Sequence, residues 1–305
     1  MSELDEPLPG EPLVGRVDDR PDSQRSAPRR PDRSIDGQAP VDVRLERAMR
    51  MLRGATVRGV KLSARAWATH PIHPWHGARV THDRALVIVG GFAGSMDFYT
   101  LLRRSYEGAG VRRVAVMPPV DNAFADIRES SERLATMVRL LGGEVDLVCH
   151  SEGGLMARWF VKELGGDEVV RHVVTLGTPN RGLPVRIEDY PWLERYSTAR
   201  RVHKIVDTVA NRTVLPMASV ALRQMLRGSE FMETLGTSVP PGRTEYLAIR
   251  SKWDGVVPFG SSDLPPAPNV ANVSLRGGPR LSNHAAIAST SSEAFEAAMT
   301  FVRRP

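Results

Sequence analysis

The sequence contains very little cysteine and no long apolar run. Cys149 is its only cysteine, so the chain forms no internal disulfide, and this composition is typical of a reducing compartment. No stretch is long and apolar enough to cross a bilayer, and the N-terminus contains no hydrophobic signal core. We therefore expect a cytoplasmic protein without a transmembrane segment. Apolar residues make up 41% of the 305 residues, which is enough to build the core of one large domain.

Large apolar side chains are also scarce in residues 1–40, which are rich in proline, arginine, serine and acidic residues. Such a segment buries too little surface to offset the entropy lost on ordering, so we expect a disordered tail. The tail contains nine acidic and six basic side chains, whereas the whole chain has a net charge of +6. The basic charge therefore belongs to the residues that follow the tail.

Residues 41–80 predict a basic amphipathic helical segment and a loop. Apolar residues recur at helical spacing from Val41 to Trp67, with arginines and a lysine between them. The first interpretation is a helix that packs on the folded domain with its charges in solvent. In the second, residues 41–67 bind an anionic membrane surface, which keeps open a membrane-associated location. No base-reading motif is present, so nucleic acid is the least favoured partner and we expect none.

Three histidines in the loop, His70, His73 and His76, are spaced three residues apart. A polyproline-type extension would align them as transition-metal ligands. Nothing nearby supplies a fourth ligand, and the neighbouring prolines are typical of a simple loop. We therefore expect no metal site and no cofactor.

A serine lies between a strand-like run and a helix-like run. Residues 144–149 form a short apolar strand pattern, and apolar residues recur at helical spacing over 155–164. Ser151 therefore lies in the turn, with the small residues Cys149 and Gly153 two positions away on either side. A serine hydroxyl becomes a nucleophile when a base accepts its proton and backbone N–H groups face the developing oxyanion. This strand-turn-helix context favours a nucleophile over an incidental flexible turn.

Strand-like and helix-like runs alternate from residue 85 onward, which predicts a mainly parallel sheet with helices on both faces. We therefore assign residues 81–305 to one α/β domain, interrupted at about 186–243. The expected strands are 86–89, 113–117, 144–149, 169–176, 246–250 and 270–275. The expected helices outside the interruption lie near 96–109, 124–141, 155–164 and 291–303.

At these motifs the chain resembles the bacterial triacylglycerol lipases and related esterases of the α/β-hydrolase fold. The resemblance extends from about residue 85 to the C-terminus. It rests on Gly90-Gly91-Phe92-Ala93-Gly94, His150-Ser151-Glu152-Gly153-Gly154, Leu176-Gly177-Thr178-Pro179-Asn180-Arg181-Gly182, Ser251-Lys252-Trp253-Asp254-Gly255-Val256-Val257-Pro258 and His284. Two positions depart from the family pattern: Cys149 stands where glycine is usual, and Gly90 stands where histidine is usual. The first change crowds the turn, and the second removes a side chain that supports the oxyanion loop in relatives.

The resemblance also implies that residues 186–243 form a helical cap, or lid, over the active site. Methionines in this interval suit a surface that accepts different acyl chains. The alternative is a plain helical cap with a packed core, because methionine at helical spacing usually serves packing. Relatives often carry a structural calcium near the histidine loop, but residues 281–286 contain no carboxylate, so this feature is not transferred.

Triads of this fold follow the chain order serine, acid, histidine, so the partners of Ser151 should come later in the sequence. His284 follows the last expected strand and fits the base, whereas His172 lies within a strand and His203 within the cap. Asp254 follows the strand 246–250 and matches the acid-bearing loop of the family. The alternative acids are Asp263, the fallback, and Asp207, which lacks a position at a strand end.

Two backbone N–H groups, those of Phe92 and Glu152, are expected to form the oxyanion hole. The Glu152 side chain begins a helix, where the helix dipole favours a carboxylate, but an inward orientation would oppose the oxyanion. We therefore expect this side chain to point outward into solvent.

Together these features predict a serine hydrolase that cleaves carboxylic esters of acyl lipids through an acyl-enzyme. The same triad serves acyltransferases and thioesterases, and the sequence does not choose the acceptor. A different class also remains open, a non-catalytic membrane-peripheral binding protein on a hydrolase fold, because a fold alone does not assign activity.

Overall fold

The computed structural model describes residues 77, 83–92, 94, 96–117, 125–184, 219–280, 282–289 and 291–305. Several predicted features lie outside the described residues: the tail 1–40, the basic segment 41–80 apart from Gly77, and residues 186–218 of the cap. The three loop histidines, His203 and Asp207 belong to these segments and stay sequence predictions.

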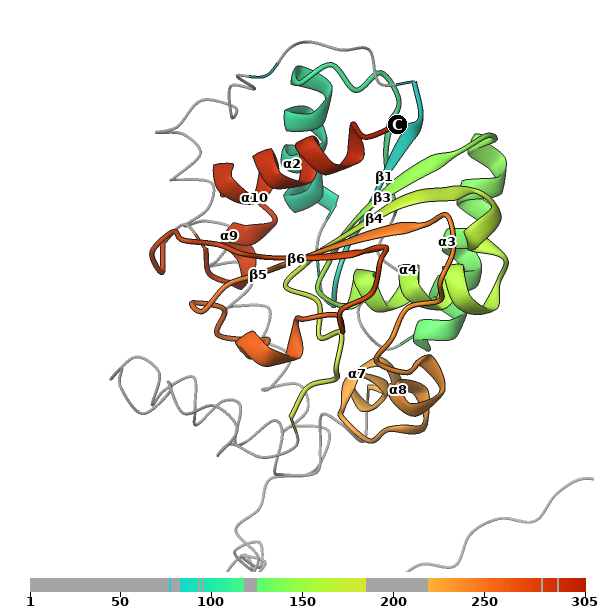
Figure 1. The fold of residues 1–305 in the computed structure, drawn as a ribbon, viewed down its shortest axis with the longest axis vertical. Coiled ribbons are helices and arrows are strands. Elements are labelled where there is room, and N and C mark those ends of the chain that lie inside the picture. The colour runs from blue at the N-terminus through green and yellow to red at the C-terminus, as the bar shows by residue number, and fades with distance from the viewer. Residues whose placement is uncertain are drawn as a thin grey trace, which may run out of the picture. The chain divides into compact units, whose positions relative to one another are not determined.

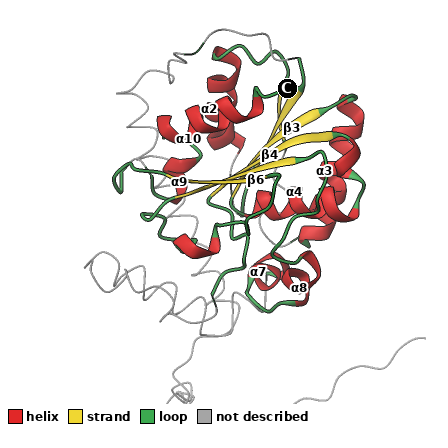
Figure 2. Ribbon diagram, viewed as in Figure 1, coloured by secondary structure: helices red, strands yellow, loops and turns green. Residues whose placement is uncertain are grey.

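A six-stranded parallel sheet forms the centre of the domain, with strand order β2-β1-β3-β4-β5-β6. Figure 2 shows its strands in yellow between two groups of helices. The strand bounds are β1 Ala85–Val89, β2 Val114–Val116, β3 Val145–His150, β4 Val170–Leu176, β5 Glu245–Arg250 and β6 Val270–Ser274. Every expected strand is present, which confirms the predicted parallel sheet.

The central strands are buried on both faces. Each residue of β1 and of β3 is buried, which explains why both strands read as nearly continuous apolar runs rather than as an alternating pattern. The outermost strand β6 has partly exposed residues along its length, as expected for a sheet edge. The central strands β1 and β3 and the edge strand β6 therefore differ in burial.

Two layers of helices cover the sheet, one on each face (Figure 1). Helices α2, Met96–Gly108, and α10, Ser292–Val302, pack on one face, where Leu86 and Ile88 of β1 contribute to a core cluster. Helices α3, Ile127–Leu141, and α4, Glu152–Glu163, cover the other face with Val87 and Val89. Neighbouring residues of β1 thus supply opposite cores, as the alternation of side chains along a strand requires.

The shorter helices lie in the connections between these elements. They are η2 Gly166–Glu168, α7 Val220–Met225, α8 Glu230–Leu235, η5 Phe259–Ser261 and α9 His284–Ile287. Within the described residues, no helix combines the length and the apolar character that are needed to cross a membrane.

The described part of the predicted cap packs tightly against the domain. Gln224 of α7 accepts a hydrogen bond from the N–H of Ile127 at 2.8 Å and so helps to hold the start of α3. Met225 and Met232 are 3% and 6% exposed and belong to the same core cluster as α3 and α4. These two methionines therefore support the packed-cap alternative and do not form an open acyl-binding surface.

Candidate active site

Ser151 occupies a sharp turn between β3 and α4. Its φ of 55° and ψ of −124° are strained for a residue with a side chain, and it is the only non-glycine residue with positive φ in the described part of the chain. The next turn of backbone needs small residues: a Cβ on Gly153 would lie 2.6 Å from the carbonyl oxygens of Val89 and Gly90. The conformation is that of a nucleophile elbow, which projects a serine hydroxyl away from the chain.

Three predicted side chains meet at the carboxyl end of the sheet. The hydroxyl of Ser151 lies 3.0 Å from Nε2 of His284, and Nδ1 of His284 lies 2.8 Å from Oδ2 of Asp254. Asp254 is 2% exposed and Ser151 is 7% exposed. With the Nδ1 proton directed to the carboxylate, Nε2 is the unprotonated nitrogen of the ring, and it faces the Ser151 hydroxyl.

The Asp254 carboxylate is fixed by its own loop. Its Oδ1 accepts hydrogen bonds from the N–H groups of Val256 at 2.9 Å and Val257 at 2.8 Å. The other oxygen, Oδ2, faces His284. The geometry of this loop therefore directs one carboxylate oxygen towards the imidazole.

Gly177 supplies the space for this pair. It follows β4 with a φ of 57°, and a Cβ at this position would lie 2.7 Å from Oδ2 of Asp254 and 3.2 Å from Nδ1 of His284. Both the left-handed backbone and the lack of a side chain are needed here. This explains the glycine in the motif Leu176-Gly177-Thr178-Pro179.

His284 does not lie in an open loop, as its position after the last strand had suggested. It is the first residue of the short helix α9. The side chain of Asn283 caps this helix by accepting a hydrogen bond from the N–H of Ala286 at 3.0 Å. The asparagine before the histidine is the sequence signal for this helix start.

The alternative candidates have other partners. His172, which is fully buried in β4, has its Nδ1 2.7 Å from Oδ1 of Asp146 in β3. Asp263, the fallback acid, forms an ion pair with Arg250. Neither residue contacts His284 through a hydrogen bond in the described structure, which leaves Asp254 as its carboxylate partner.

The loop after β1 crosses directly over the serine turn. A Cβ on Gly91 would lie 2.6 Å from Cβ of Ser151 and 3.4 Å from the backbone nitrogen of Glu152. Phe92 follows in a turn, is partly buried and packs against the core cluster of α3 and α4. The two residues expected to supply the oxyanion donors are therefore on adjoining segments.

The expected outward orientation of Glu152 is wrong. Its side chain is only 4% exposed, because every residue of α4 from Glu152 to Val161 is buried within the domain. Burial raises the pKa of the Glu152 carboxyl to about 8, since removal from water penalises its charged form. At neutral pH this side chain is mainly protonated and carries little negative charge that would oppose an oxyanion.

Sequence reasoning missed two further residues beside this site, Tyr99 of α2 and His150 at the end of β3. The Tyr99 hydroxyl accepts a hydrogen bond from the N–H of Gly91 at 2.8 Å and lies 2.8 Å from Nδ1 of His150. Nε2 of His150 lies 2.9 Å from the carbonyl oxygen of His284. The unusual Gly90 was the available signal, because a Cβ there would lie 2.6 Å from the Tyr99 ring.

No protein-family model matches the chain, and no curated protein matches it in sequence. Solved structures do match it. The mature form of Bacillus licheniformis lipase BlEst2 has a TM-score of 0.53 and 17% identity, with 74% of this chain and 95% of the lipase covered. A metagenome-derived lipolytic enzyme of the LipS and LipT pair has a TM-score of 0.51 and 17% identity, with 73% and 95% covered.

Aspergillus fumigatus lipase B has a TM-score of 0.50 and 17% identity over 70% of this chain. The match covers 52% of that lipase, so this chain spans about half its length. At these identities the similarity concerns architecture. With the six-stranded parallel sheet and its two helix layers, it shows that the chain has the α/β-hydrolase fold.

Proposed function

We propose that the protein is a serine hydrolase that cleaves carboxylic esters, with Ser151 as nucleophile, His284 as base and Asp254 as the orienting acid. The observation that carries this proposal is the continuous hydrogen-bond path from the Ser151 hydroxyl through both nitrogens of His284 to Asp254. The strained turn at Ser151 supports it, because such strain is typical of a serine held ready for attack.

The reaction begins when Nε2 of His284 accepts the Ser151 proton while Oγ attacks the ester carbonyl carbon. The carbonyl oxygen becomes an oxyanion, for which we propose the N–H groups of Phe92 and Glu152 as donors. The intermediate expels the alcohol, which takes the proton from His284. Water then attacks the acyl-enzyme with His284 again as base, which releases the acid and restores Ser151.

We further propose acyl lipid esters as the substrate class, since lipases are prominent among the structures that share this architecture. A series of p-nitrophenyl esters of increasing acyl length, with and without anionic vesicles, tests this proposal. Faster turnover of long-chain esters, increased by vesicles, is the expected result. A preference for short soluble esters that ignores vesicles would contradict a lipid substrate and leave the esterase proposal intact.

A fluorophosphonate probe tests the proposed nucleophile directly. We expect the wild-type protein to be labelled and Ser151→Ala to remain unlabelled, because the probe reacts with a serine whose hydroxyl is activated by a base. Ser130→Ala is a suitable control, since Ser130 is another buried serine at 1% exposure but lies in α3. Absence of labelling in the folded wild type would favour a non-catalytic protein on this fold.

Gly177→Ala is expected to lower kcat by about 100-fold, since the new Cβ would displace the Asp254–His284 pair by a fraction of an ångström or more. Gly165→Ala provides a matched control, because Gly165 also has a positive φ, of 72°, but has no neighbour within 4 Å. Gly165→Ala should lose about 1 kcal/mol of stability from backbone strain alone, and Gly177→Ala should lose more, because its Cβ also clashes with Asp254. Ester hydrolysis and urea unfolding measure the two effects, and equal kcat values in the two variants would contradict the proposed role of the space at Gly177.

A further inference from the structure

We propose that Tyr99 and His150 are positioning residues. They hold the loop after β1, which contains Gly91 and Phe92, and the backbone of His284 in fixed positions relative to Ser151. This inference rests on the proposed function of Ser151 and His284. The contacts run in one direction across the site: Gly91 N–H to the Tyr99 hydroxyl, the hydroxyl to His150, and His150 to the carbonyl of His284. Each link measures 2.8 to 2.9 Å between heavy atoms.

With a neutral His150 ring, the donors and acceptors of this path allow only one arrangement. The carbonyl of His284 can only accept, so Nε2 of His150 must carry the proton, and Nδ1 is then an acceptor. The Tyr99 hydroxyl therefore donates to Nδ1 and accepts from Gly91. Every group is satisfied with a single tautomer of His150, so the path fixes the side chains rather than letting them alternate.

Burial protects this arrangement from competing water. Tyr99 is 2% exposed and His150 is 8% exposed. The Tyr99 ring also fills the space above Gly90 and Gly94, where a Cβ would approach it to 2.6 Å at either position. Tyr99 thus occupies the room of a side chain at position 90 and supports the same loop from α2.

The charge state of His150 agrees with a positioning role. Its ring lies beside that of His284, with the ring centroids 4.7 Å apart. Burial, together with nearby His284, lowers the pKa of His150 to about 3, so this ring stays neutral while His284 becomes protonated during the reaction. A neutral neighbour does not repel the imidazolium, and His150 is also not a second base.

Tyr99→Phe tests the proposal because it retains the ring and removes the hydroxyl. We expect kcat to fall by about 10- to 100-fold, since the variant leaves the Gly91 N–H and His150 without their buried partner. We expect KM to change by less than about threefold, because oxyanion donors act mainly in the transition state. A purely structural role would lower stability without this separation of kcat from KM.

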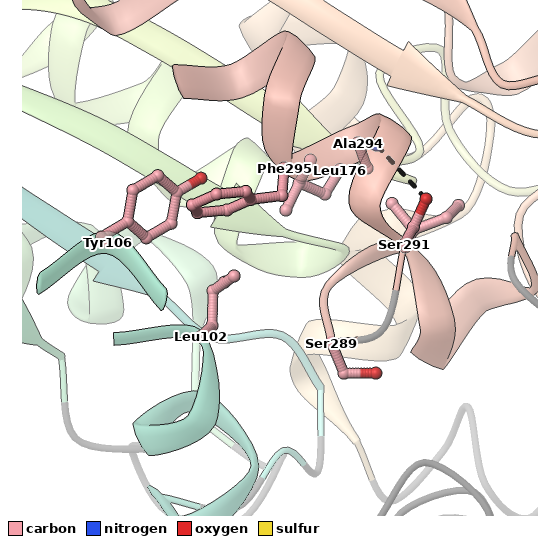
Figure 3. A pocket seen from close by; sticks show the side chains of 8 residues that line it. Leu102, Tyr106, Leu176, Ser289, Ser291, Ala294 and Phe295 are labelled. Carbon is pink, nitrogen blue, oxygen red and sulfur yellow. Dashed lines mark hydrogen bonds between the residues drawn. The ribbon is translucent and has the colours of Figure 1, made fainter. Parts of the chain in front are cut away.

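Tyr106→Phe is the matched control. Tyr106 also belongs to α2 and is fully buried, but its hydroxyl has no hydrogen-bond partner in the described part of the chain. Figure 3 shows its ring beside that of Phe295, among the residues that line a small pocket. The two ring centroids are 5.0 Å apart. We expect this variant to retain wild-type kcat and KM. Equal kcat values for Tyr99→Phe and Tyr106→Phe would overturn the proposal.

Substitutions of His150 give an independent test that does not depend on Tyr99→Phe folding well. His150→Gln retains a donor near the Nε2 position and His150→Asn retains an acceptor near the Nδ1 position. We expect either variant to lower kcat at least 10-fold, because each preserves one link and breaks the other. Full kcat in both folded variants would overturn the proposal.

A double-mutant cycle tests whether Tyr99 and His150 act as one unit. The double variant Tyr99→Phe/His150→Asn should lower kcat by a factor much smaller than the product of the two single-variant factors. If the two residues acted independently, these factors would multiply. Fluorophosphonate labelling separates this inference from the proposed function. If wild type is labelled at Ser151 but the two changes multiply, the coupling fails and the hydrolase proposal stands. If folded wild type is not labelled, the proposed function itself fails.

Discussion

Asp254→Asn is expected to lower kcat for ester hydrolysis by about 10⁴-fold, with a much smaller change in KM. The loop explains why the amide cannot imitate the acid. The N–H groups of Val256 and Val257 both require an acceptor at the Oδ1 position, so the oxygen of the introduced amide would stay there. The amide NH₂ then faces Nδ1 of His284, which moves the imidazole proton to Nε2 and prevents it from accepting the Ser151 proton.

Asp263→Asn is the control for this prediction, because the sequence left Asp263 as the alternative acid. Its carboxylate pairs with Arg250 and not with His284. We expect kcat to stay within about threefold of wild type, because this partly exposed ion pair has no hydrogen bond to His284 in the described residues. Steady-state kinetics of both variants decide the assignment. A large loss in Asp263→Asn with little loss in Asp254→Asn would reverse the roles.

The sequence predicted the fold well because the sheet is parallel and covered on both faces. Strands such as β1 and β3 then read as short apolar runs between helical patterns, and that alternation defines the architecture. The ends of elements were less certain. Residues 113–117 were expected to form a strand, but β2 includes only Val114–Val116, at the edge of the sheet where only one neighbour stabilises it.

The sequence also named Ser151, Asp254 and His284, since a strained turn and the ends of later strands leave local signals. Tyr99 and His150 carried no such signal at their own positions, and the only indication was the unusual Gly90 in the loop after β1. Their hydrogen bond joins residues 51 positions apart in the chain, and only the packing of α2 against the end of β3 brings them together. The spacing of residues along one element predicts its faces, but it does not predict which polar groups meet between elements.

Glu152 was misjudged for a related reason. An acidic residue in the first turn of a helix is usually stabilised by the helix dipole at an exposed position, and the sequence offers no sign that this helix start is covered. In the folded protein α4 is buried from its first residue to Val161. Packing therefore outweighs the local preference, and the carboxyl is held away from water with a raised pKa.

Glu152→Gln is accordingly expected to stabilise the protein at alkaline pH and to have little effect at pH 4.5. The pKa of Glu152 rises from 4.5 to about 8 in the folded state. Between these values the folded protein retains a proton that the unfolded chain has lost, so its stability falls as the pH rises. Glutamine has no proton to lose, and its advantage should grow to as much as about 5 kcal/mol above pH 8.

Urea unfolding of both proteins at pH 4.5, 7 and 9 measures this difference. Other perturbed groups, including His150, are common to both proteins, so the difference isolates Glu152. Glu129→Gln is the control, because Glu129 also lies in the first turn of a helix but is exposed.

Activity should follow the same pH dependence. Above about pH 8 an ionised Glu152 opposes the developing oxyanion, so the kcat of wild type falls while that of Glu152→Gln does not. If Glu152→Gln were no more stable than wild type at pH 9, other groups of the folded protein would have to stabilise the ionised Glu152 carboxylate. The neutral state inferred for this side chain at pH 7 would then be wrong.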